Sequence, residues 1–125
     1  MLKTISNNPA DIIPTADIVL FCLPAFLVEQ TLETIKPYLS SKTIVGSVVG
    51  NTGFFIFAHK VLADQPIGLF AFQRVPYISR VVEYGKKASL LGYKDKLLIA
   101  TEHISNPQEF CNDISMLFCT PTILL

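Results

Sequence analysis

The sequence has 125 residues, of which 50% are hydrophobic and 16% are charged, with ten basic and ten acidic side chains. This length fits one domain, because a chain of this size can bury one core but not two. The high hydrophobicity excludes a disordered chain. The balanced charge argues against broad nucleic-acid binding, which depends on a surplus of lysine and arginine to displace counterions from phosphates.

Neither a membrane span nor an export signal is evident in the sequence. The longest apolar run, residues 18–28, has about half of the roughly 20 residues that a spanning helix needs, and Pro24 interrupts it. The N-terminus lacks the continuous apolar stretch of a signal peptide, so we expect a cytoplasmic protein with no membrane partner. The odd number of cysteines and their apolar neighbours favour reduced thiols over a disulfide framework; they are Cys22, Cys111 and Cys119.

The first half of the chain alternates between strand and helix patterns. Residues 18–23 are typical of a strand buried on both faces, and from Ala25 apolar residues recur at helical spacing as far as Lys36. Further along we expect a strand over residues 43–49, a helix over 54–63 capped by Asn51 or Thr52, and a strand over 67–73. This alternation predicts an α/β fold with a parallel sheet and right-handed crossovers.

The second half begins with an antiparallel pattern. Residues 80–84 and 88–93 predict a hairpin around a Gly85-Lys86-Lys87 turn, and residues 96–101 predict another strand that closes an antiparallel edge. A final helix is expected from Pro107 to before Pro121, followed by the apolar residues 123–125.

Candidate ligand contacts follow two of the predicted parallel strands. Ligands of open α/β sheets bind beyond the carboxyl ends of the strands, close to helix N-termini that attract anions. The candidate residues are Leu23, Pro24 and Ala25 after one strand, and Gly50, Asn51, Thr52 and Gly53 after the next. A rigid helix start at Pro24 and a simple tight turn at the glycines explain these residues equally well.

Charge is distributed unevenly along the chain. Between Arg74 and Lys96 lie six basic and two acidic residues, a net charge of +4, and the remainder of the chain carries −4. Arg74 and Arg80 follow a buried strand and could bind a carboxylate or phosphate in a bidentate way. For the lysines of this region, protection of an exposed sheet edge is the better explanation; they are Lys86, Lys87, Lys94 and Lys96.

Several familiar catalytic patterns are missing. His59 and His103 have no carboxylate or cysteine at metal-ligand spacing, so we expect no zinc site. His59 is expected to be exposed on its helix, and His103 to be a loop residue without a role rather than a general acid or base. Neither a Walker loop nor a G-x-S-x-G elbow is present.

Four segments together resemble a known family: residues 16–25 (ADIVLFCLPA), 36–39 (KPYL), 44–45 (IV) and the turn 50–53 (GNTG). They are similar to the later half of the NAD(P)-binding domain of opine (octopine/nopaline) dehydrogenases, a group related to ketopantoate reductase and 6-phosphogluconate dehydrogenase. The resemblance covers most of residues 10–102. It implies backbone contacts from 23–25 to the nicotinamide half of NAD or NADP, with 50–53 nearby. It also implies that the substrate cleft begins at residues 73–80, the segment that contains Arg74 and Arg80, the candidates for a substrate carboxylate.

The sequence departs from the family in one large respect. The G-x-G-x-x-G fingerprint that seats the pyrophosphate is absent, as is the helical domain that supplies substrate and catalytic residues in such enzymes. We therefore expect one truncated domain over residues 1–125: a partial Rossmann-like parallel sheet with helices, an antiparallel hairpin extension and a C-terminal helix. It would derive from a nicotinamide-dependent oxidoreductase acting on a small carboxylate-bearing metabolite. Alone, it would be inactive and would not bind its cofactor tightly.

A second interpretation is a non-catalytic α/β interaction module that self-associates. A third, a flavodoxin-like or response-regulator domain, is disfavoured because no phosphate loop or acidic cluster is present. The apolar surplus predicts surface that a second copy covers: the helix at residues 54–57, an unpaired sheet edge and the apolar end 123–125. We therefore expect a homo-oligomer.

Overall fold

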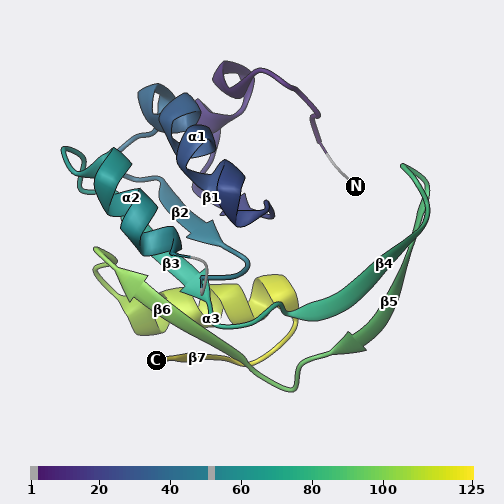
Figure 1. The fold of residues 1–125 in the computed structure, drawn as a ribbon. Helices are drawn as coiled ribbons and strands as arrows, with labels where there is room; N and C mark the ends of the chain where they lie inside the picture. The colour runs from purple at the N-terminus through teal and green to yellow at the C-terminus, as the bar shows by residue number, and fades with distance from the viewer. Residues whose placement is uncertain (1–2, 51–52) are drawn as a thin grey trace.

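The computed structural model describes residues 3–50 and 53–125 (Figure 1). The strands are β1 (Ile18–Phe21), β2 (Ile44–Ser47), β3 (Gly68–Phe72), β4 (Tyr77–Glu83), β5 (Lys87–Tyr93), β6 (Leu97–Glu102) and β7 (Thr122–Leu124). The helices are α1 (Ala25–Ile35), α2 (Phe54–Leu62) and α3 (Pro107–Phe118), with short 3₁₀ turns η1 (Pro9–Asp11), η2 (Ile13–Thr15) and η3 (Lys36–Tyr38). None of the described helices is both long and apolar enough to cross a membrane.

The central sheet has the strand order β1-β2-β3-β6-β7 among the described residues. Strands β1, β2 and β3 are parallel, β6 runs antiparallel to β3, and β7 is parallel to β6. The predicted α/β fold with a sheet that is parallel in its first half is confirmed. Strand β7 was not predicted from the sequence; the apolar end of the chain forms this strand and pairs with β6.

Helices cover both faces of this sheet (Figure 1). The alternation along β3 shows why: Leu69 and Ala71 join the core beneath α1 and α2, whereas Phe70 and Phe72 join the core beneath α3. A strand that is apolar at every position needs cover on both sides. All five residues of β3 are buried, as that pattern predicts.

The helix boundaries follow from local chemistry. Helix α1 ends at Ile35 and tightens into the turn η3, because Pro37 has no N–H to continue the helical hydrogen-bond ladder; Lys36 itself keeps a helical conformation, with φ of −45° and ψ of −45°. Helix α3 begins with Pro107 at its first position, and the side chain of Asn106 accepts a hydrogen bond from the Glu109 amide at 3.3 Å. It ends at Cys119, which adopts a left-handed conformation with φ of 49°.

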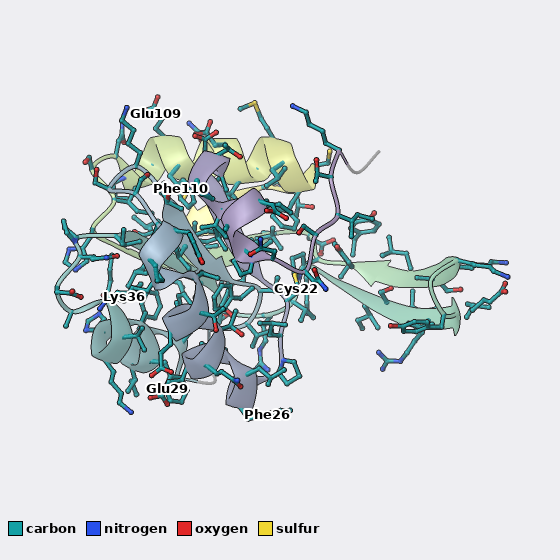
Figure 2. All side chains as sticks on the ribbon, turned by 90° about the horizontal axis from the view of Figure 1, so that it is seen from above. Cys22, Phe26, Glu29, Lys36, Glu109 and Phe110 are labelled. Atoms are coloured by element: carbon teal, nitrogen blue, oxygen red, sulfur yellow. The ribbon has the colours of Figure 1, made fainter. Side chains whose placement is uncertain are left out.

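The hairpin β4–β5 forms a separate two-stranded sheet that projects from the body of the molecule (Figures 1 and 2). The expected hairpin is confirmed, with a first strand that starts earlier, at Tyr77. The expected antiparallel strand over residues 96–101 is confirmed as β6, which pairs with β3 in the central sheet and not with the hairpin. The physical reason is burial: Leu97 and Ile99 must lie beneath α3, whereas every residue of β4 is exposed.

Two expectations about apolar residues need correction. Only Cys111 is buried; Cys22 and Cys119 are exposed, and all three thiols are free. The helix at residues 54–57 also leaves less apolar surface than expected, because Phe54 is fully buried and only Ile56 is strongly exposed, at 73%. The α2 helix turns its phenylalanines toward α1 and the sheet, which the helical period alone did not reveal.

Candidate functional site

The carboxyl ends of the three parallel strands meet at one edge of the sheet. The Val48 amide donates to the Phe21 carbonyl at 3.0 Å, and the Gly50 amide donates to the Phe72 carbonyl at 2.8 Å. These two bonds tie the segment after β2 to the ends of both neighbouring strands. Residues 23–25 and Gly50, which the sequence indicated as separate candidate ligand contacts, therefore lie at the same edge of the sheet.

Helix α1 starts at this edge without a side-chain cap. Its N-cap residue is Pro24, which has no hydroxyl or carboxamide to offer, and the Pro24 carbonyl accepts the Leu27 amide at 3.0 Å. Leu23 and Phe26 are 42% and 81% exposed, and Phe26 points away from the body of the molecule (Figure 2). The first amides of α1 and an apolar rim are therefore open to a ligand.

Helix α2 starts in the same way. Its N-cap is Gly53, whose φ of +83° is a left-handed conformation that favours glycine and which has no side chain of its own to cap the helix. At Gly50 the backbone is pressed against β3, because a Cβ there would lie 2.5 Å from the Ala71 Cβ. Asn51 and Thr52, including their expected capping role, lie outside the described residues.

The two uncapped helix starts define the chemistry that this edge can perform. Their free N–H groups and the positive ends of their helix dipoles suit phosphate or carboxamide oxygens. The nicotinamide half of a dinucleotide carries both kinds of oxygen, so the described backbone fits such a cofactor. The side chains of this edge add no titratable group at residues 23–25, so here the protein can bind and orient but not transfer a proton.

The structure separates the two candidate arginines. Arg74 lines a cavity of about 510 Å³ at the root of the hairpin. Arg80 lies within β4, where its guanidinium donates to the Ser79 carbonyl at 3.0 Å, and it does not line that cavity. Lys94 and Lys96 do line it, although the sequence explained them as edge protection. One feature of the sequence could have predicted this arrangement: Arg74 and Lys96 are equidistant from the turn at Gly85, so a symmetric hairpin brings them together.

The histidines lie away from this edge. His59, on α2, contacts the carboxylate of Glu102 on β6 and is exposed, as expected for its helix. His103 follows β6 with φ of 55° and lines a cavity of about 460 Å³ together with His59. That cavity includes Ile67, which precedes β3, so it opens at the opposite end of this strand from Arg74. In the described residues no group of three His, Cys, Asp or Glu side chains could hold a metal ion.

Sequence comparison finds relatives of one kind, although no family model matches. The chain is 31% identical over 99 residues to an opine dehydrogenase of Haliotis discus hannai, covering 78% of this chain and 24% of that relative. It is 26% identical over 117 residues to an octopine dehydrogenase of Mizuhopecten yessoensis, covering 92% and 29%. A tauropine dehydrogenase of Arabella iricolor is 30% identical over 97 residues, covering 76% and 24%. The chain thus spans about a quarter of the length of these curated relatives.

Solved structures show the same fold. Octopine dehydrogenase in complex with NADH and agmatine superposes with a TM-score of 0.88 at 24% identity, covering 98% of this chain and 32% of that one. A ketopantoate reductase from Ralstonia eutropha gives a TM-score of 0.65 at 17% identity, covering 96% and 37%. The resemblance carried by residues 16–25 and the 50–53 turn is thereby confirmed, and the chain is a homologue of one part of the opine dehydrogenases.

Proposed function

We propose that this chain is part of a nicotinamide-dependent oxidoreductase that acts on a small carboxylate-bearing metabolite. The observation that carries the proposal is the pair of uncapped helix starts, at Pro24 and Gly53, beside the closely packed Gly50. The relatives support it, since they are named opine, octopine and tauropine dehydrogenases. Octopine dehydrogenase structures hold NADH together with L-arginine in one case and pyruvate in another.

The residues of the edge have separate roles in this proposal. Backbone groups of Leu23, Pro24 and Ala25 hold the nicotinamide half of NAD or NADP, and the turn of Gly50, Asn51, Thr52 and Gly53 contributes to binding from nearby, facing the cofactor or substrate. The bound cofactor supplies or accepts the hydride of the reaction. Arg74 holds the substrate carboxylate, because of the two arginines it is the one that lines a cavity at this end of β3. Arg80 is the weaker candidate for that role.

The chain by itself is proposed to be one incomplete nucleotide-binding domain, inactive alone. The support is the missing G-x-G-x-x-G motif, without which no glycine-rich turn seats the pyrophosphate. A fluorescence titration with NADH and NADPH should show no saturable binding in the micromolar range, and micromolar binding would contradict this proposal. Sequencing the transcript upstream of Met1 tests directly whether the chain derives from such an enzyme. We expect an in-frame extension that encodes a β-strand followed by the G-x-G-x-x-G motif. An in-frame stop codon upstream of Met1, with no such motif before it, would favour the alternative below.

The alternative is a self-associating α/β module, and one surface favours it. A cavity of about 730 Å³ separates the hairpin from the body, with Leu20 and Leu117 on one side and Tyr77 and Tyr93 on the other. Every residue of β4 and all of β5 except the half-buried Ser89 are exposed, and the hairpin is rich in large apolar side chains, although an isolated two-stranded hairpin is only marginally stable in water. A second copy is the proposed cover, because the region 74–96 is basic and the rest of the chain is acidic.

Size-exclusion chromatography with light scattering tests the self-association proposal. We expect a dimer that dissociates as salt is raised, because opposite charges on the two copies are screened. A monodisperse monomer at low salt would overturn it. Exchanging Val81, which is 69% exposed on the hairpin, for Ser should weaken the dimer, whereas the same exchange at the buried Val45 would instead destabilise the fold.

A further inference from the structure

The cavity at the root of the hairpin has an unusual charge. Arg74, Lys94 and Lys96 line it together with a single acidic residue, Asp95, with Gln73 and with two leucines that begin β6. Three positive charges thus face one volume of about 510 Å³ with one negative charge among them. A volume of this size suits a small ligand.

The cavity lies between two chain segments, residues 73–76 and 94–98, which are joined by a backbone hydrogen bond at each end. The Gln73 amide donates to the Leu98 carbonyl at 2.8 Å, and the Lys94 amide donates to the Pro76 carbonyl at 3.0 Å. Residues 73–76 and 94–96 belong to no strand, because the central sheet has ended and the hairpin sheet begins only at Tyr77. The backbones of these two segments therefore do not continue the hydrogen-bond ladder, and side chains from both segments line an opening between them.

Among the residues that the structure describes, these three cations have no ion-pair or side-chain hydrogen-bond partner. The ion pairs of the described residues are Lys36–Asp64, His59–Glu102, Lys60–Glu29 and Lys86–Glu83. Within the same described ranges, no side-chain hydrogen bond engages Arg74, Lys94 or Lys96, unlike Arg80, which bonds to a backbone carbonyl. Like charges around one cavity repel one another, and a bound anion would remove that repulsion.

We propose that Arg74, Lys94 and Lys96 form a binding site for a small dianion. The arginine fork suits two oxygens of one carboxylate or phosphate, and the two ammonium groups supply compact charge around it. The site lies at the carboxyl end of β3, whose last carbonyl, that of Phe72, accepts the Gly50 amide. It therefore adjoins the edge assigned to the cofactor. Calling the anion a substrate rests on the proposed function; the existence of the site does not.

Titration of the 125-residue chain with malonate, and separately with inorganic phosphate, followed by backbone amide NMR, tests this site. The expected result is saturable shifts of the Gln73, Arg74 and Lys96 amides, with sodium chloride of equal ionic strength producing none. Tighter binding of malonate would identify a carboxylate ligand, and tighter binding of phosphate would identify a phosphate such as that of a dinucleotide. Shifts that never saturate, or that chloride reproduces, would overturn the site.

Matched variants separate a built site from general electrostatics. Arg74→Gln should weaken dianion binding about tenfold or more, because it removes a charge-assisted bidentate contact. Lys87→Gln removes the same charge from an exposed position at the far end of the hairpin and should leave the affinity within about twofold. Equal losses in the two variants would overturn the proposal. Both side chains are exposed, so both variants are expected to unfold at the denaturant concentration of the parent chain.

The same titrations distinguish this site from the proposed function. Nicotinamide mononucleotide is the second probe, read at the Ala25 and Gly53 amides. Dianion binding that Arg74→Gln abolishes supports the site even if the mononucleotide fails to bind, in which case only the proposed function is contradicted. Mononucleotide binding without any dianion binding overturns the site and leaves the proposed function standing.

Discussion

Gly46 on β2 and Phe70 on β3 are register partners, and the Phe70 ring fills the space that a side chain at position 46 would need. A Cβ on Gly46 would lie 2.1 Å from Cε1 of Phe70. The ring cannot retreat easily, because it is fully buried and packs edge-on against Phe110 with ring centres 4.9 Å apart. The glycine thus allows a large aromatic ring to lie directly over β2 in the middle of the parallel sheet.

Gly46→Ala should therefore destabilise the fold by about 1–3 kcal/mol, because the added methyl group overpacks the core against Phe70. Urea unfolding followed by circular dichroism measures the change. Gly92→Ala is the matched control, since a Cβ there meets nothing within 4 Å and its backbone is not left-handed. An unchanged midpoint for Gly46→Ala would show that the Phe70 ring can move aside.

Asn106 is expected to stabilise helix α3 through a reciprocal cap. Its side chain accepts from the Glu109 amide at 3.3 Å and donates to the Glu109 carboxylate at 2.9 Å. Asn106→Ala should cost about 1 kcal/mol of unfolding free energy, whereas Asn106→Gly should cost only a few tenths. Thermal unfolding of the two variants provides the comparison. Both variants remove the side-chain bonds, so the absence of a loss in Asn106→Ala would show that these bonds do not stabilise the start of α3.

The ion pair between Lys36 and Asp64 predicts a pH-dependent term in stability. The hydrogen bond from Lys36, at 2.6 Å, is the largest cause that lowers the pKa of Asp64 below its ordinary value of 3.8. A carboxyl group with a depressed pKa in the folded state stabilises the fold above its unfolded pKa, and this contribution is lost as pH falls through the folded pKa. The stability deficit of Asp64→Asn should therefore be present at neutral pH and disappear in acid below pH 3.8.

Two measurements check the Lys36–Asp64 prediction. Urea unfolding between neutral pH and strong acid should show the deficit of Asp64→Asn shrinking with acidity. Carboxyl NMR should also show the pKa of Asp64 rising in Lys36→Met. A pKa of Asp64 that does not change in that variant would contradict the assigned cause.

The three thiols should react at different rates. Cys22 and Cys119 are exposed, whereas Cys111 has no exposed surface; burial raises the thiol pKa of both Cys22 and Cys111, so access to the reagent and not pKa separates these two. A maleimide should therefore label Cys22 and Cys119 in the native chain and Cys111 only after unfolding. Mass spectrometry of the labelled peptides identifies them. Rapid native labelling of Cys111 would show that α3 detaches from the sheet.

Local sequence patterns were sufficient to predict the helices and strands whose buried residues recur at a regular spacing. The apolar run of β1, the spacing of Val28, Leu32 and Ile35 in α1, and Pro107 at the start of α3 all carry their signal within a few neighbouring residues. The partner of β6 could not be predicted in this way. Its pairing with β3 and β7 depends on contacts between residues far apart in sequence, such as Leu97 with Thr122.

The candidate site shows the same division between local and distant signals. The segments at Pro24 and Gly50 were found because each joins a strand to a helix, which is visible locally. The cation cluster was missed because Arg74 and Lys96 come together only when the hairpin folds back, and two irregularities in its register blur the symmetry around Gly85. The burial of Phe54 was also missed, because a helix that is apolar on several sides does not reveal which side meets α1.

The most direct test of the central claim is an amide NMR titration of the 125-residue chain with nicotinamide mononucleotide, with adenosine monophosphate as the comparison. The claim is that the edge formed by residues 23–25 and the 50–53 turn recognises the nicotinamide half of a dinucleotide. It predicts weak, saturable shifts at Ala25, Gly50 and Gly53 with the nicotinamide ligand, and much smaller shifts there with the adenine ligand. Absence of shifts at these three amides, or equal shifts with both ligands, would contradict it.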